Sequence, residues 1–541
     1  MRALAFGSKT FKILTIMNFK SKYPILLGGL MAMGCDPSLV DLPPTSPTEQ
    51  SYFSNVNEFR TQLIGVYAAI YDDYHFGANG YNGWVAGTWL LPGDDLTETQ
   101  GARTAFELFD GSLNPSHAHL RWIFASAYKT IARANVTIDK VNTVDYSTFE
   151  GKDEITAMKG EALFLRGYSY FKLFNIFGSV PLVVKRLQTE AETNTPKSDP
   201  VEVITQVIDD CREAINYLPE SWDPTYAGRI TKNGARGLLA KALVFRANYT
   251  GNNADYQEAL TVFSSITATL VPNFIDNFNA KTENNAESLY EVQAATPSGG
   301  NNNLQLGNDG AWRGVENLSV YRGFMMEFGG RGDFNDASST KFLITRKLLD
   351  KFGDDPRIKV FLNDSDGFNG RIFQKYHKPD GTNELSGFHG GSVNNERVLR
   401  YADVKLLAAE AALKTGNINA AVQHVNDVRS RARTWAAAAG VGDGTAPADY
   451  NAAGANEATV MQWIMDERYI ELAGEGHRWW DLKRWHKAGS INLTGWTGGD
   501  EHFSSYLSSP IVFDVNKHLV FPLPQAEIDR NSGIFENNPG Y

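Results

Sequence analysis

The amino-acid sequence predicts a mainly α-helical protein that is built from pairs of helices. Three observations carry this prediction. Apolar residues recur with the 3.6-residue period of a helix over long stretches, as in Thr156–Phe177. These stretches come in pairs that are separated by short polar turns. Two of the turns contain Gly-Asn, at Gly251-Asn252 and Gly416-Asn417, and small residues lie where the paired helices would cross.

Four helix pairs are expected along the chain, at about 58–141, 156–217, 232–266 and 401–433. Their members are Glu58–Tyr71 with Leu120–Val141, Thr156–Phe177 with Pro200–Tyr217, Lys232–Asn248 with Ala254–Ile266, and Tyr401–Lys414 with Asn419–Arg433. The Gly-Asn turns and the small residues at the crossings are similar to those of tetratricopeptide helix pairs. The sequence therefore predicts a tetratricopeptide-like scaffold of about four pairs.

The composition changes between the third and fourth pairs. Residues 273–391 are rich in Gly, Asn and Asp and contain short strand-like pieces, such as Ser288–Gln293 and Arg371–Tyr376. Residues 76–110 and 440–455 are also irregular. Loops of this length inside a compact protein usually carry function or are disordered. Because the first two regions contain many aromatic residues, we expect them to be ordered.

Charge and cysteine content exclude several classes of protein. The 541 residues have a net charge of −11, and residues 1–34 contribute five basic and no acidic residues, so the rest carries −16. So acidic a body disfavours nucleic-acid binding, which requires clustered Lys and Arg. Cys35 and Cys211 are the two cysteines, so neither a disulfide framework nor a cysteine-rich zinc site is expected.

Residues 1–34 are typical of an export signal. Basic residues precede the apolar stretch Tyr23–Met33, and Gly34 stands directly before Cys35. This order resembles a bacterial lipoprotein signal, in which the cysteine is lipidated, although Ala32 stands where Leu is usual. Two alternatives stay open: an uncleaved signal with an ordinary thiol at Cys35, and initiation at Met17. Residues 35–50, with their prolines, are expected to form an extended tether to a body at 51–541.

Short motifs follow one another in order along nearly the whole chain. They are Leu42-Pro43-Pro44-Thr45, Arg133-Ala134-Asn135, Gly160-Glu161-Ala162, Phe177-Gly178-Ser179-Val180-Pro181-Leu182, Arg400-Tyr401-Ala402-Asp403, Glu467-Arg468-Tyr469-Ile470-Glu471-Leu472, Gly476-His477-Arg478-Trp479-Trp480-Asp481 and Asn538-Pro539-Gly540-Tyr541. Together with the lipoprotein-like start, the set resembles the SusD/RagB family, the surface glycan-binding lipoproteins of Bacteroidetes. The last of these motifs fall in a C-terminal region at 457–541.

The resemblance implies a fold, a ligand and a partner. The helix pairs would form a scaffold, and an irregular portion at about 273–391 would hold the glycan site. A SusC-like TonB-dependent outer-membrane barrel would be the partner, with this protein as its lid. The resemblance implies no catalytic residues and no cofactor, and it places the protein at the cell outer membrane, lipid-anchored through Cys35 and facing the exterior.

Two irregular segments have the composition that a sugar site requires. Sugars present apolar C–H faces flanked by hydroxyls, so a binder needs flat aromatic rings beside amides and carboxylates. The predicted glycan-binding residues are Tyr81, Trp84 and Asp95 in the first segment and Asn303, Gln305, Trp312, Arg313 and Tyr321 in the second. A tryptophan in a loop can equally cover the helical core, and Trp89, beside Leu90-Leu91, is expected there, as are Trp479, Trp480 and Trp485.

Glu467, Glu471 and Glu475 recur at four-residue spacing and would line one face of a helix. A glycosidase needs two carboxylates on opposite sides of the scissile bond, about 5–9.5 Å apart, which neighbours on one helix face do not provide. We expect these residues to accept hydrogen bonds from Arg478, Arg484 or backbone amides. His117 and His119 have no third ligand nearby, so no metal site is predicted.

The sequence thus predicts non-catalytic binding of an oligosaccharide or polysaccharide and its delivery to the barrel. One alternative is a docking lid with little glycan affinity of its own. An all-α glycosidase is the other. No phosphate-binding loop, dinucleotide fingerprint or nucleophile elbow occurs.

Overall fold

The computed structural model describes residues 52–72, 87–98, 104–293, 342–362, 375–376, 394–498, 511–531 and 533–541. The compact unit described below is Phe53–Tyr541. The predicted signal, the tether and Cys35 lie outside the described residues.

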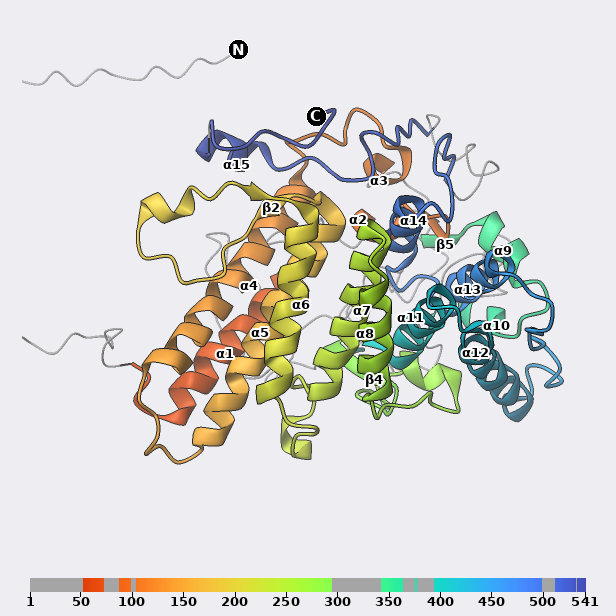
Figure 1. Ribbon diagram of the computed structural model, residues 1–541, viewed down its shortest axis with the longest axis horizontal. Helices are drawn as coiled ribbons and strands as arrows, with labels where there is room; N and C mark the ends of the chain where they lie inside the picture. Colours follow the sequence, from red (N-terminus) through yellow and green to blue (C-terminus); the bar gives the residue numbers. More distant parts are fainter. Residues whose placement is uncertain are drawn as a thin grey trace, which may run out of the picture. The chain divides into compact units, whose positions relative to one another are not determined.

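Eight helices form a continuous series in which each packs on the next, as Figure 1 shows from the red α1 to the teal α12. They are α1 (Val56–Asp72), α4 (Ala118–Thr143), α5 (Lys152–Phe177), α6 (Pro200–Tyr217), α7 (Lys232–Thr250), α8 (Asn253–Ser264), α11 (Tyr401–Lys414) and α12 (Ile418–Ala439). Taken two by two, these are the four predicted pairs. The mainly α, helix-pair fold is therefore confirmed.

The two Gly-Asn turns work as the sequence suggested. Gly251 and Gly416 have φ angles of +70° and +87°, a left-handed conformation that glycine adopts without strain at the end of a helix. The asparagine that follows caps the next helix. Asn252 Oδ1 accepts a hydrogen bond from the Ala254 amide, and Asn417 Oδ1 accepts one from the Ala420 amide, each at 3.1 Å. Two adjacent residues thus end one helix and start its partner.

Helix α5 is the most deeply buried member of the series. The sequence predicted an apolar stripe, but almost every residue from Ile155 to Phe177 is buried, because α1, α4 and α6 all pack on this helix. Its polar residues join the neighbours: Arg166 Nη2 lies 2.6 Å from Asp210 Oδ1 on α6, and Nη1 donates to Asn135 Oδ1 on α4 at 2.7 Å. The motif that contains Asn135 is therefore part of the packing between α4 and α5.

Short elements and a C-terminal set of helices complete the described part. Near the C-terminus stand α13 (Glu457–Glu471), which packs on α11 and α12, α14 (Arg478–Lys487), which packs on α7, and α15 (Gln525–Arg530). The short helical elements are α2 (Gly87–Leu90), α3 (Thr104–Leu108), η1 (Glu190–Thr193), η2 (Pro224–Tyr226), η3 (Phe274–Phe278), α9 (Arg346–Phe352) and α10 (Ile358–Phe361).

Three two-stranded antiparallel sheets are present in the described residues. They pair β1 (Leu96–Glu98) with β5 (Phe342–Ile344), β2 (Val180–Pro181) with β3 (Lys197–Ser198), and β4 (Ser288–Val292) with β6 (Glu396–Arg400). The strand predicted at Ser288–Gln293 is confirmed as β4. The one predicted at Arg371–Tyr376 is wrong at its described end, since Lys375 and Tyr376 form a turn.

The β4–β6 sheet approaches α7 closely. A Cβ on Gly234 would lie 2.7 Å from the carbonyl oxygen of Leu289, and one on Gly237 would lie 2.8 Å from its side chain. Glycine at both positions therefore lets the strand lie against the helix backbone. None of the helices in the described part of the chain is both long and apolar enough to cross a bilayer.

Candidate functional site

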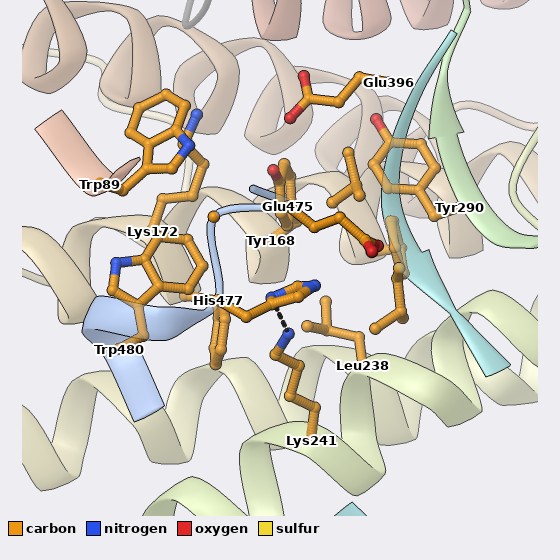
Figure 2. Close-up of a pocket in the computed structure, with 15 residues that line it drawn as sticks. Trp89, Tyr168, Lys172, Leu238, Lys241, Tyr290, Glu396, Glu475, His477 and Trp480 are labelled. Atoms are coloured by element: carbon orange, nitrogen blue, oxygen red, sulfur yellow. Dashed lines mark hydrogen bonds between the residues drawn. The ribbon is translucent and has the colours of Figure 1, made fainter. Parts of the chain in front are cut away.

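An enclosed pocket lies between α5, α7 and the β4–β6 sheet (Figure 2). Its wall includes Tyr168 and Lys172 from α5, Lys241 from α7, Tyr290 from β4, Glu396 from β6 and His477 from the turn before α14. Aromatic rings and charged groups of this kind are what a sugar site would contain.

Lys241 links two groups at the edge of this pocket. Its Nζ lies 2.7 Å from Asp403 Oδ2 and 3.1 Å from His477 Nδ1. Burial, reinforced by the nearby ammonium of Lys241, lowers the pKa of His477 to about 4, so the ring is neutral at pH 7. Because Nδ1 accepts from Lys241, the ring proton is assigned to Nε2. Within the described residues Nε2 has no hydrogen-bond partner, and it points into the pocket (Figure 2).

Trp89 closes one side of the enclosed pocket. Lys172 Nζ lies 4.8 Å from the centroid of its ring, a cation–π contact. Gly476, with a φ angle of +79°, passes so close to the indole that a Cβ there would lie 2.7 Å from Trp89 Cδ1. Trp89 is 4% exposed. The prediction that it belongs to the core is confirmed, as it is for Trp479, Trp480 and Trp485, which are buried too.

Size decides what the enclosed pocket can hold. Its volume is about 30 Å³. A buried water needs roughly 10–15 Å³ of such space, so one or two waters fit and a sugar ring does not. A water there would accept a hydrogen bond from His477 Nε2. The enclosed pocket is thus too small to be a site for a glycan.

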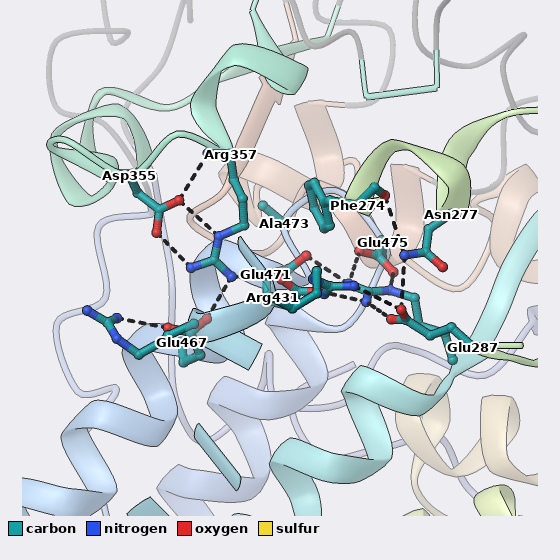
Figure 3. Close-up of polar contacts among 12 residues, drawn as sticks. Phe274, Asn277, Glu287, Asp355, Arg357, Arg431, Glu467, Glu471, Ala473 and Glu475 are labelled. Carbon is teal, nitrogen blue, oxygen red and sulfur yellow. Dashed lines mark hydrogen bonds and ion pairs between the residues drawn. The ribbon is translucent and has the colours of Figure 1, made fainter. Parts of the chain in front are cut away.

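A dense network of buried ion pairs adjoins this cavity (Figure 3). Arg400 Nη1 lies 2.7 Å from both Glu471 Oε1 and Glu287 Oε1, and Arg400 Nε lies 2.6 Å from Glu475 Oε2. The members are the basic residues Arg357, Lys375, Arg400, Arg429 and Arg431 and the acidic residues Glu287, Asp355, Glu467, Glu471 and Glu475. We call this set the ion network.

Glu471 is the centre of the ion network. Burial alone would raise its pKa, but Arg431, Arg400 and Arg357 hold the pKa of this carboxyl well below its usual range. Lys375 is buried as well, and that burial lowers its pKa to about 8 even though Glu475 contacts it. With five basic and five acidic groups, the ion network stays near neutrality, which buried charges require.

The ion network confirms one prediction and corrects another. Glu467, Glu471 and Glu475 do have a structural role, because each is bound to basic side chains. Their expected partners were wrong: Arg478 pairs with Asp94, and Arg484 pairs with Glu410 and Asp481. Glu475 also does not share the helix face, because α13 ends at Glu471.

Most of the predicted glycan-binding residues lie outside the described residues. These are Tyr81, Trp84, Asn303, Gln305, Trp312, Arg313 and Tyr321. Asp95 is described and is 1% exposed. Its Oδ2 accepts a hydrogen bond from the Gly474 amide at 3.0 Å, and burial, with Asp94 adjacent, raises its pKa to about 6. A glycan role for Asp95 stays a prediction.

The described part holds no group of three His, Cys, Asp or Glu side chains that could bind a metal ion. The rings of His117 and His119 pack on Phe106, with centroids at 4.7 and 6.0 Å. Cys211 is buried, as expected for a small apolar residue of α6. Burial also raises the pKa of its thiol well above the usual value.

An open hollow beside the turn between α6 and α7 was not predicted. Its wall includes Trp222, Tyr226 and Arg229, and its volume is about 190 Å³. We call it the α6–α7 hollow. A signal for it exists in the sequence, because residues 222–226 read Trp-Asp-Pro-Thr-Tyr and so place two aromatic residues in a proline-containing turn.

These features define a helix-repeat protein in which the pocket between α5, α7 and the β4–β6 sheet of the described part is too small for a sugar ring. Two family models match the chain: the one described as "SusD family" matches residues 364–541, and the one described as "Starch-binding associating with outer membrane" matches residues 101–244. The resemblance to the SusD/RagB family that the motifs indicated is thus confirmed by both family models.

Several relatives match over nearly their full length. SusD-like protein P2 of Formosa agariphila is 25% identical over 548 residues, which cover 97% of this chain and 99% of the relative. SusD-like protein P25 of the same organism is 24% identical, and the match covers 94% of this chain and 96% of that relative. Among solved structures, a "Laminarin binding SusD-like protein" has a TM-score of 0.68 at 23% identity, covering 90% of this chain and 100% of that one. A SusD homolog from Bacteroides thetaiotaomicron has a TM-score of 0.70 at 20% identity, and the match covers 91% of this chain and 99% of that one.

Proposed function

We propose that this protein is a non-catalytic glycan-binding protein of the cell surface. It binds an oligosaccharide or polysaccharide and delivers it to a SusC-like TonB-dependent outer-membrane transporter. The observation that carries the proposal is similarity to SusD-like proteins over almost the whole chain, with 97% of its length matched to one such relative at 25% identity. The description of one matching family model as starch-binding, and the name of a similar structure as laminarin-binding, support a glycan as the ligand.

The proposed glycan site is formed by the segments that carry Trp84 and Trp312. Their attachment points support a single site. Residues 73–86 lead into α2, residues 294–341 leave after β4, and residues 377–393 enter β6. Trp89 of α2, Tyr290 of β4 and Glu396 of β6 all line the enclosed pocket. The described residues next to these three segments therefore lie around the same pocket. Few atoms would be desolvated at an open site, so binding of one short oligosaccharide should be weak.

The proposal is tested by affinity electrophoresis of the chain from Asp36 onward through gels that contain laminarin, starch, xylan or mannan. One neutral polysaccharide should retard the protein. Trp312→Ala should abolish the retardation, whereas Trp312→Phe, which keeps a ring for stacking, should retain part of it. Retardation that survives Trp312→Ala would keep the function and discard this site. The absence of retardation by every polysaccharide would favour a docking lid instead.

The proposed location is the outer membrane, with Cys35 lipidated and the body facing the exterior. The small residue before Cys35 and the proline-containing tether after it support this arrangement. Cys35→Ala should move the protein from the membrane fraction to the soluble fraction, because the acyl chains supply the anchoring energy. Cys211→Ala is the matched control and should leave the protein in the membrane fraction. An unchanged distribution of Cys35→Ala would contradict the anchor.

A further inference from the structure

The α6–α7 hollow is larger and more open than the enclosed pocket. At about 190 Å³ it is smaller than the roughly 300–1,000 Å³ of pockets that enclose a drug-sized ligand. It has room for a ligand the size of a sugar ring, or for the end of a chain that continues into solvent. The turn between α6 and α7 forms one wall, and Asn284 and β4 form the other.

The aromatic side chains of the hollow are held in place before any ligand arrives. Trp222 Nε1 donates to the Ile230 carbonyl at 2.8 Å, and the guanidinium carbon of Arg229 lies 3.7 Å from the centroid of the indole. Tyr226 meets Trp222 edge to face, with centroids 6.3 Å apart. Two rings fixed at an angle lose little conformational entropy when a ligand contacts them.

Tyr226 remains accessible in this arrangement. It is 37% exposed and is the one aromatic residue among the exposed large hydrophobic side chains of the described part. Its ring therefore lines the hollow and remains accessible to solvent. A tyrosine ring offers an apolar face beside a polar hydroxyl, which suits contact with a sugar ring.

Polar groups that can pair with hydroxyls flank the rings. Asp223 is exposed, and one of its oxygens accepts from the Thr225 amide at 2.9 Å, which fixes the turn and leaves the second oxygen toward solvent. On the other wall, Asn284 is held by reciprocal hydrogen bonds with Gln293 at 2.9 and 3.0 Å. A Cβ on Gly228 would lie 2.4 Å from Gln293 Cδ, so the turn is pressed against this wall.

The charges around the hollow select the class of ligand. Arg229 pairs with Glu161 at 2.5 Å and with Glu154 at 2.7 Å, and Arg60, whose guanidinium lies 5.9 Å from the Tyr226 ring, also pairs with Glu154. Both cations are therefore already neutralised. Asp223 adds a negative charge at the mouth. A phosphate, sulfate or uronate group would meet repulsion there, whereas an uncharged sugar would not.

We propose that the α6–α7 hollow is a second saccharide-binding subsite, which stacks a neutral sugar ring on Tyr226 and pairs its hydroxyls with Asp223 and Asn284. The assignment rests on the proposed glycan-binding function and adds a contact outside the predicted loops. A long polysaccharide that occupied both sites would bind more tightly than either site alone provides, because the second contact is intramolecular.

The test is affinity electrophoresis of the chain from Asp36 onward, which retains the whole Phe53–Tyr541 unit. The gels contain laminarin, starch, xylan or mannan, and alginate serves as an anionic comparison. Tyr226→Ala should weaken binding to the retarding neutral polysaccharide about threefold to tenfold, the range expected for loss of one stacked ring. Tyr226→Phe, which keeps the ring, should bind like the wild type. Alginate should retard none of these proteins.

Combination of Tyr226→Ala with Trp312→Phe, which keeps part of the retardation, separates the two claims. A further loss of retardation in this double variant, relative to Trp312→Phe alone, would support a second subsite. If Tyr226→Ala binds the polysaccharide as the wild type does, the subsite is overturned and the proposed function stands. If no polysaccharide retards the wild type, both are overturned. Thermal unfolding of each variant checks that altered mobility does not come from a lost fold.

Discussion

The enclosed pocket and the α6–α7 hollow are lined by the same kinds of side chain and are suited to opposite roles. In each, a basic residue lies over an indole: Lys172 over Trp89 at 4.8 Å, and Arg229 over Trp222 at 3.7 Å. The pocket has about 30 Å³ of space and the hollow about 190 Å³. Residue types alone therefore do not distinguish a core from a binding site. The space beside the rings does.

The surroundings explain the difference. The pocket is closed by two helices, a sheet and the turn before α14, and the ion network lies against it. The hollow is bounded by one turn and one strand edge, so it remains open to solvent. Substitutions in the closed region should change stability, whereas substitutions in the open one should change binding.

The largest effect is expected at the centre of the ion network. Glu471→Gln preserves the shape of the side chain but leaves Arg357, Arg400 and Arg431 short of one negative charge. Breaking a buried ion pair from one side costs about 3–5 kcal/mol. Urea unfolding should show a loss of this size. The control is Asp350→Asn, which removes the exposed pair with Arg346 and should cost at most about 1 kcal/mol. Equal losses in both variants would contradict the closed character of the ion network.

A smaller loss is expected where Gly476 passes Trp89. Gly476→Ala should cost about 2–4 kcal/mol, because the left-handed backbone disfavours alanine and the new Cβ meets the indole. Gly251→Ala separates these causes, since its φ is also positive and nothing lies within 4 Å of the Cβ. It should lose about 1–2 kcal/mol. If Gly476→Ala loses no more stability than Gly251→Ala, the Trp89 ring moves to accommodate the new Cβ, and the close contact adds nothing to the cost. The polysaccharide affinity of the folded variants should be unchanged.

Asp94 and Asp95 should respond to pH with opposite signs. Burial raises the pKa of Asp95 to about 6, so its carboxyl reduces stability as the pH rises from about 4 to 6. Asp95→Asn should therefore gain about 1–3 kcal/mol relative to the wild type between pH 4 and pH 7. Burial would also raise the pKa of Asp94, but Arg478 and Lys347 lower it below its usual value, so its stabilising effect is lost in acid. Asp94→Asn should remove the stability that the wild type loses as the pH falls below about 4. Urea unfolding at pH 7, at pH 4 and below pH 4 measures the two slopes, and slopes of the same sign would contradict this assignment.

The smallest effect on stability is expected in the hollow. Tyr226 is part of the exposed surface, so Tyr226→Ala should shift the unfolding free energy by no more than about 0.5 kcal/mol. Thermal or urea unfolding checks this value. A loss of several kcal/mol would show that the hollow is a packing element like the enclosed pocket.

The helix pairs could be predicted because helices and their caps are local. Hydrogen bonds four residues apart and an apolar period of 3.6 are visible in any stretch of sequence. Gly416 and Asn417 end α11 and cap α12 with contacts that span only a few residues. The predicted helices therefore match the observed ones closely. The predicted glycan-binding residues in the two aromatic segments remain predictions.

Contacts between distant segments could not be predicted in this way. The sequence indicated that Glu467 and Glu471 are structural but assigned them partners close in the chain. Arg357 and Arg400, the residues that bind them, lie 110 and 71 positions away along the chain. Nothing in a single sequence states which distant helix faces will meet.

By itself, the sequence of this protein determined the helix pairs, their turns and the resemblance to the SusD/RagB family, because each depends on patterns within short segments. The tertiary structure decided which carboxylates meet which arginines and which tryptophan is enclosed. The tertiary structure alone decided that Tyr226 is exposed at the α6–α7 hollow whereas Trp89 is buried beside the enclosed pocket. Exposure and cavity volume are properties of several segments packed together, and no segment carries them alone.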